Sequence, residues 1–287
     1  MTSTAAAPDS SCDRLESLFS QRIETGSVEV PLLPKVASEV LTMVYDPNAE
    51  ASKLAGLIHQ DQALAAHVIR VANSPAYMPR NPVVSLQHAV AMLGMNLLSE
   101  IAFTTSLKNA ALKVEGFERE IKGLWRHSLA SGAYAKEIAR MRRFNVESAY
   151  LCGLLHAIGK PVVVQTAAAL SKEHRLPIEP GSLDRLLAGY HTRVGSLIAH
   201  KWALPQQVAE SIAFYEHYDQ ATGARQECMT TCLADRLATH LLQPESMDEA
   251  VVRDHPVYAE LNLYPDDVGA LLQMKDKIAA VVEAMNV

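Results

Sequence analysis

One short stretch of the chain is the most informative about its fold: Gly153-Leu154-Leu155-His156-Ala157-Ile158-Gly159-Lys160. It places a single histidine inside a run of apolar residues. Such a histidine is most often a core residue held by a hydrogen bond, and less often a metal ligand. The glycines do not form a GxxxxGK[ST] or GxGxxG pattern, so the stretch is not a phosphate-binding loop. The role of His156 therefore depends on which polar side chains elsewhere in the chain reach it.

The spacing of apolar residues around this stretch is helical almost throughout. Leu64, Val68 and Val71 form one apolar stripe, and comparable stripes recur up to the end of the chain. Asp61 and Ser85 are placed to cap the helices that follow them. Strand signals are nearly absent, and no fixed-period repeat appears. The pattern predicts an all-α, multi-helix protein.

Composition excludes several classes of protein. Hydrophobic residues make up 49% of the 287 residues, and the net charge is −6, so nucleic-acid binding is not indicated. We see no apolar run of the length of a membrane span and no secretion signal at the start of the chain. The four cysteines are scattered, as is typical of reduced thiols. We therefore expect a cytoplasmic protein without a membrane contact.

Four short motifs precede the histidine stretch in a characteristic order. They are PLLPKVA at 31–37, LIHQDQAL at 57–64, VANS at 71–74 and AVAMLG at 89–94. Each is weak alone, but their order and spacing together resemble the HDOD domain, a bacterial signalling family. That family is a degenerate, all-helical relative of the HD-domain metal phosphohydrolases. The resemblance covers residues 28–237 and implies an HD-like helical bundle with an N-terminal helical subdomain packed on it.

This resemblance divides the chain into four parts. They are an N-terminal tail with a short helix (1–27), an N-terminal helical half (28–111), an HD-like half (116–237) and a C-terminal helical extension (238–287). The join at 113–116 is too short to act as a flexible linker. We expect the two halves to pack into one body.

The HD pattern runs His, His-Asp, His, Asp on separate helices of a bundle, and it implies metal ligands at His127, His156, His191 and Asp235. Imidazole and carboxylate ligands suit a single divalent ion such as Fe, Mn, Ni or Zn. The family places Asp directly after the second histidine, whereas this chain has Ala157, which cannot bind an ion. Because the missing carboxylate also helps to position a metal-bound nucleophile, we assign no catalytic residue.

The resemblance leaves three functions open. The first is a non-catalytic or weakly catalytic regulatory module that contacts a signalling protein in a bacterial pathway. Tyr77, Met78 and Arg80 are candidates for that contact, while Asn73 and Ser74 are interpreted as helix-ending residues. The second is a metal-dependent phosphohydrolase acting on a nucleotide or cyclic dinucleotide, and the third is a pocket that binds a nucleotide without cleaving it. HDOD domains often accompany receiver or cyclic di-GMP domains, and we expect any such domain to lie on another protein or in a part of the protein outside this sequence.

Overall fold

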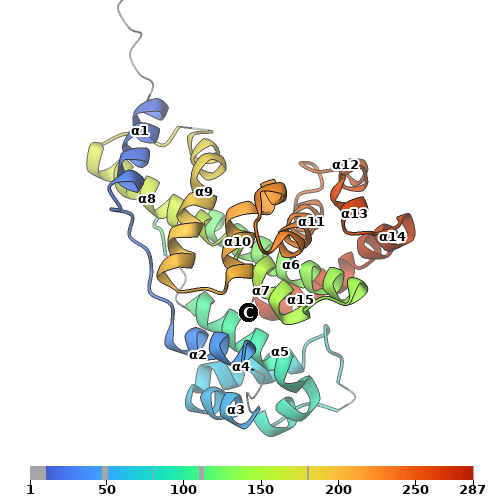
Figure 1. Ribbon diagram of the computed structural model, residues 1–287. Coiled ribbons are helices and arrows are strands. Elements are labelled where there is room, and N and C mark those ends of the chain that lie inside the picture. The colour runs from blue at the N-terminus through green and yellow to red at the C-terminus, as the bar shows by residue number, and fades with distance from the viewer. Residues whose placement is uncertain (1–10, 47–50, 80, 110–112, 180, 287) are drawn as a thin grey trace, which may run out of the picture.

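Figure 1 shows the computed structural model, which describes residues 11–46, 51–79, 81–109, 113–179 and 181–286. Within these ranges the chain forms helices and no strands, as the apolar spacing predicts. The helices are α1 (Ser11–Glu24), α2 (Lys35–Val44), α3 (Ala51–Gln60), α4 (Gln62–Ala72), α5 (Leu86–Asn109), α6 (Glu118–Arg142), α7 (Val146–Leu155), α8 (Gly159–His174), α9 (Ser182–Lys201), α10 (Gln206–Phe214), the 3-10 helix η1 (Tyr215–Gln220), α11 (Arg225–Leu242), α12 (Glu249–Arg253), α13 (Val257–Glu260), α14 (Pro265–Gln273) and α15 (Lys275–Met285).

Local sequence signals account for several helix ends. The Asp61 carboxylate accepts a hydrogen bond from the Leu64 backbone N–H at 3.0 Å, and the Ser85 hydroxyl accepts one from the His88 N–H at 3.2 Å. Both caps were predicted from the sequence. Each satisfies a backbone donor that the first turn of a helix leaves without a partner.

The chain packs as two lobes joined along α5, α6 and α15. Helices α2 to α5 form the lower lobe in Figure 1, and α6 to α11 form the upper lobe, with α6 in contact with α7, α11 and α15. A buried ion pair links the lobes, because Lys136 on α6 contacts both carboxylate oxygens of Glu100 on α5 at 2.5 Å. The Tyr150 and Thr104 hydroxyls make a second buried link at 2.8 Å.

The predicted end of the HD-like half at residue 237 falls inside α11, which continues to Leu242. Ala238 is fully buried, so the apolar face of this helix extends past the predicted boundary. The C-terminal extension predicted from the sequence therefore includes the end of α11. Its last helix, α15, returns to α5 and α6, where Arg126 pairs with Glu283 at 2.6 Å.

Two segments, Leu86–Asn109 and Val146–His174, are long and apolar enough to cross a membrane by length and composition alone. Half of the first apolar window and 72% of the second lie buried inside the fold, as core helices do. The first segment is also bent at Gly94, whose φ is 74°.

Candidate metal centre

Two glycines position the histidine stretch among its neighbours. A Cβ atom on Gly153 would lie 2.6 Å from the Ser131 carbonyl oxygen of α6, and one on Gly159 would lie 2.0 Å from the His191 carbonyl oxygen of α9. Both distances are far inside van der Waals contact, so only glycine permits these helix approaches. The turn between α7 and α8 is therefore pressed against both α6 and α9, with His156 fully buried inside it.

His156 contacts acceptors through both ring nitrogens. Its Nδ1 lies 2.7 Å from the Gly153 carbonyl oxygen, and its Nε2 lies 3.0 Å from the Asp235 Oδ1. A carbonyl and an ionised carboxylate only accept hydrogen bonds. A ring that donates from Nδ1 to the carbonyl leaves Nε2 facing the carboxylate, an arrangement that a cation shared by the two groups would complete.

His127 reaches the same carboxylate from α6. Its Nε2 lies 3.5 Å from Asp235 Oδ1 and 3.1 Å from the Thr239 hydroxyl. Burial lowers the pKa of His127 to about 4, although the Asp235 charge acts in the opposite direction. The ring is therefore neutral at pH 7, which is the state that binds metal.

Asp235 lies on α11 between the two histidines. Burial by itself would raise the pKa of this carboxyl, but the hydrogen bond from His156 and the nearby charges of His127, His156 and Lys160 hold it well below its usual range. The carboxylate is thus ionised. One ligand atom from each of these three residues lies within 4.8 Å of the other two.

These three residues fit a single divalent ion. The donor set of two imidazole nitrogens and one carboxylate oxygen suits zinc, iron, manganese or nickel. The hydrogen bond from His156 Nδ1 to a backbone carbonyl is the second contact that metal-binding histidines usually make. His127 Nε2, His156 Nε2 and Asp235 Oδ1 would hold the ion, and water or a ligand would complete its coordination.

His191, the fourth residue of the predicted set, has other partners. Its Nδ1 lies 2.7 Å from the Leu187 carbonyl oxygen, and its Nε2 lies 2.9 Å from the Tyr215 hydroxyl, which also approaches Glu216 at 3.1 Å. Burial lowers the pKa of His191. The ring can donate from Nδ1 to the Leu187 carbonyl, and Nε2 faces the Tyr215 hydroxyl, whose single proton is donated to Glu216. Among the described residues, His191 therefore behaves as a hydrogen-bonded core histidine beside the three-residue group.

A cleft of about 500 Å³ opens beside the group, and His127 and Asp235 form part of its wall. Arg119 and Lys160 bring positive charge to the cleft, and Glu120, Asp184 and Glu216 bring negative charge. Because the cleft carries charges of both signs, it does not attract anions without selectivity. An anionic ligand would have to approach Lys160 and the histidines selectively.

Sequence reasoning did not assign roles to three residues of this site. Lys160 belongs to the quoted stretch, and Thr239 follows Asp235 by one helical turn, so spacing alone could have indicated both. Tyr215 fills the space between two histidines, with its ring centroid 4.8 Å from that of His156 and 5.9 Å from that of His191. No local pattern marks Tyr215, because its partners come from distant helices.

A model of the HDOD domain matches residues 30–218 of the chain. The chain belongs to the HDOD family. The match covers the lower lobe and the upper lobe as far as η1, and it contains His127, His156 and His191. It ends before Asp235, so that residue is joined to the group by the fold described above.

Solved structures with the same fold cover nearly the whole chain. An HDOD domain protein of unknown function from Geobacter sulfurreducens is 22% identical, with a TM-score of 0.71, and covers 93% of this chain and 98% of its own. A Shewanella amazonensis protein provisionally named a metal-dependent phosphohydrolase is 20% identical, with a TM-score of 0.71 and coverage of 96% and 99%. A Marinobacter aquaeolei protein provisionally named for signal transduction is 21% identical, with a TM-score of 0.70 and coverage of 98% and 68%. At these identities the likeness shows the fold alone.

A curated relative of undescribed function from Treponema pallidum is 23% identical over 235 residues. The alignment includes 78% of this chain but 45% of the relative. The HDOD chain thus spans less than half the length of that relative.

Proposed function

We propose that this HDOD protein is a regulatory module that acts through protein–protein contacts in a bacterial signalling pathway. The observation that carries the proposal is the incomplete metal set. Ala157 stands where the family has a carboxylate, and the His191 ring contacts the Leu187 carbonyl and the Tyr215 hydroxyl. Two of the five positions of the HD pattern therefore contribute no ligand, which weakens the metal binding that hydrolysis requires. The helical scaffold does not depend on these ligands. The provisional name of the Marinobacter neighbour agrees with this direction.

The described residues on either side of residue 80 offer an apolar surface for such contacts. The Asn73 side chain donates to the Val83 carbonyl and accepts from the Val83 N–H, both at 2.8 Å, which closes the loop between α4 and α5. The loop presents Met78 and Val84, whose relative exposures are 79% and 83%. Met78 also has a φ of 36°, an unfavourable conformation that the loop imposes on it. Exposed apolar side chains on a fixed loop are typical of contact sites.

Of the predicted contact residues, Met78 fits this surface best. Tyr77 is half-buried and lines a different cavity between the lobes. Arg80 lies outside the described residues. Asn73 ends α4, as predicted. The sequence did not predict its two side-chain hydrogen bonds to the Val83 backbone.

A photo-crosslinking experiment in the native host tests the contact surface. A photoreactive residue at Met78 should capture a discrete partner, and Val84→Glu should abolish that adduct because the charge interrupts the apolar surface. Val251→Glu, at a half-exposed apolar residue on α12, is the matched control and should leave the adduct unchanged. Equal capture in Val84→Glu and in the parent would contradict the proposal.

The second candidate function is a metal-dependent phosphohydrolase. It is favoured by the close approach of His127, His156 and Asp235 beside an open cleft, and by the provisional name of the Shewanella neighbour. A bound ion would polarise a phosphate and acidify water, while Lys160 would approach the phosphate charge. Metal analysis followed by assays with a nucleotide and a cyclic dinucleotide tests this function. Stoichiometric metal with turnover that His156→Ala abolishes would overturn the regulatory proposal.

The third candidate is a nucleotide bound in the same cleft without cleavage. Arg119 and Lys160 are the cations available for its phosphates. A nucleotide at 100 times its dissociation constant should stabilise the fold by about 2.7 kcal/mol, which a thermal shift detects. The absence of a shift with every member of a nucleotide panel would exclude this function.

A further inference from the structure

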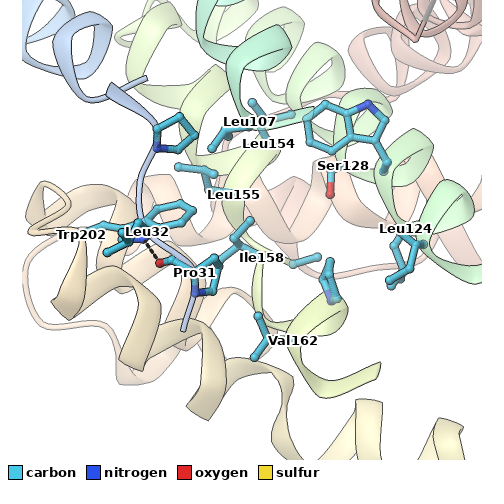
Figure 2. Close-up of a pocket in the computed structure, with 15 residues that line it drawn as sticks. Pro31, Leu32, Leu107, Leu124, Ser128, Leu154, Leu155, Ile158, Val162 and Trp202 are labelled. Carbon is cyan, nitrogen blue, oxygen red and sulfur yellow. Dashed lines mark hydrogen bonds between the residues drawn. The ribbon is translucent and has the colours of Figure 1, made fainter. Parts of the chain in front are cut away.

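An apolar cavity lies next to the histidine group and shares Leu124 with the wall of the charged cleft. It has a volume of about 70 Å³ and is bounded by the 27–34 segment, α6, the α7–α8 turn and the end of α9. Figure 2 shows Leu155, Ile158 and Val162 on one side of it and Trp202 on another. Both tryptophans of the chain, Trp125 and Trp202, belong to its wall.

Two polar groups interrupt the apolar wall. The Trp125 Nε1–H is buried with no partner among the described residues. The Ser128 hydroxyl, visible in Figure 2, projects from α6 among the apolar side chains, and no hydrogen bond joins it to a described residue. Ser128 itself is 8% exposed. A hydroxyl in such a position gains free energy when a ligand oxygen pairs with it.

The cavity owes its apolar character partly to Ala157, which lines it. A carboxylate at this position would put a charge beside the cavity, and burying an unpaired charge is costly. Ala157 therefore has two effects: the metal set has one carboxylate fewer, and the wall of the cavity is apolar at this position. Ala157 and Ser128 each follow a histidine of the group directly, so the two sites share the backbone between them.

The cavity also borders solvent. Leu32 lines it while 79% of that residue is exposed. The surrounding segment is fixed by hydrogen bonds from Trp202 Nε1 to the Pro31 carbonyl at 2.9 Å and from Lys201 Nζ to the Val30 carbonyl at 2.7 Å. A ligand can thus enter beside Leu32 without unfolding of the segment that holds it.

We propose that this cavity binds a small apolar molecule that carries one hydrogen-bonding oxygen, of the class of short aliphatic ketones and aldehydes. Each water-sized group needs about 10–15 Å³ of such space, so the cavity takes roughly six non-hydrogen atoms. The apolar walls select the hydrocarbon part, and the Ser128 hydroxyl donates to the carbonyl oxygen. This site is separate from the metal group and from the Met78 surface, so its test does not depend on either.

Tryptophan fluorescence tests the proposal, because both indole rings of the protein lie in this wall. Titration with 2-pentanone, which has six non-hydrogen atoms, should produce a saturable change in emission. Ser128→Ala should weaken the binding of 2-pentanone by roughly twofold to tenfold, since it removes the donor to the carbonyl oxygen. The binding of its isosteric alkene, 2-methyl-1-pentene, should be unchanged by Ser128→Ala, because the alkene has no acceptor for the hydroxyl.

A filled cavity provides the control. Ile158→Phe adds a ring at the half-buried Ile158 and should abolish the saturable change, and Val162→Leu, a smaller addition, serves if circular dichroism shows that the first variant is unfolded. A linear dependence of emission on ketone concentration in the parent indicates collisional quenching and would overturn the proposal. A saturable change of the same midpoint in the folded, filled variant would also overturn it.

Discussion

Replacing Gly159 with alanine tests how closely the start of α8 approaches the backbone of α9. The added Cβ would lie 2.0 Å from the His191 carbonyl oxygen and 2.6 Å from the Gly195 nitrogen. Ordinary contact begins at 3.4 Å, so the two backbones must separate by about 1.4 Å. Because the obstructing atoms are backbone, no side-chain rotation relieves the clash.

The expected cost of Gly159→Ala is about 3 kcal/mol of the free energy of unfolding, at the upper end of the range for overpacked cores. Urea denaturation followed by circular dichroism measures this loss. Gly189→Ala on the exposed face of α9 is the matched control, since a Cβ there meets nothing within 4 Å. That variant should gain up to about 1 kcal/mol from helix propensity.

A loss below about 1 kcal/mol for Gly159→Ala would refute the reasoning, because it would mean that α8 and α9 do not approach as closely as described. The variant also reports on the histidine group. Separation of α8 from α9 should weaken the contact of His191 with Tyr215 while the Asp235 contact to His127, made from α6, persists.

Three further predictions follow from buried polar contacts. Glu100→Gln should cost roughly 3–5 kcal/mol of unfolding free energy in urea denaturation, because it leaves Lys136 uncompensated between the lobes, and the double replacement Glu100→Leu with Lys136→Met should recover most of this loss. Asn73→Ala should cost about 1–3 kcal/mol and speed proteolysis of the loop after α4, whereas an unchanged cleavage rate would argue against the clamp. The pKa of Glu210 is lowered from 4.5 to about 2, above all by the hydrogen bond from the Gly223 N–H. A lowered pKa stabilises the fold above the unfolded value, so this contribution should be lost as the pH falls from about 4.5 to about 2, and thermal melts of Glu210→Gln should show a weaker loss over that window.

Much of the architecture was predictable because its causes are local. Helical spacing, the Asp61 and Ser85 caps and the ordered motifs of the first half all act within a few residues, and each was confirmed. The boundary predicted at residue 237, in contrast, falls inside α11. The extension of α11 to Leu242 depends on burial of Ala238 against neighbouring helices, which no local signal reports.

The sequence alone determined the family and the helical class, and it placed His127, His156 and Asp235 among four predicted ligands. It also identified the loss of a carboxylate at Ala157, since that is a matter of residue type. Only the tertiary structure decided how these residues are used. It brings His127, His156 and Asp235 together and pairs His191 with Tyr215 instead, because contacts between distant helices depend on how closely their backbones approach. Gly153 and Gly159 permit that approach, because a Cβ atom at either position would clash with backbone atoms more than twenty residues away along the chain.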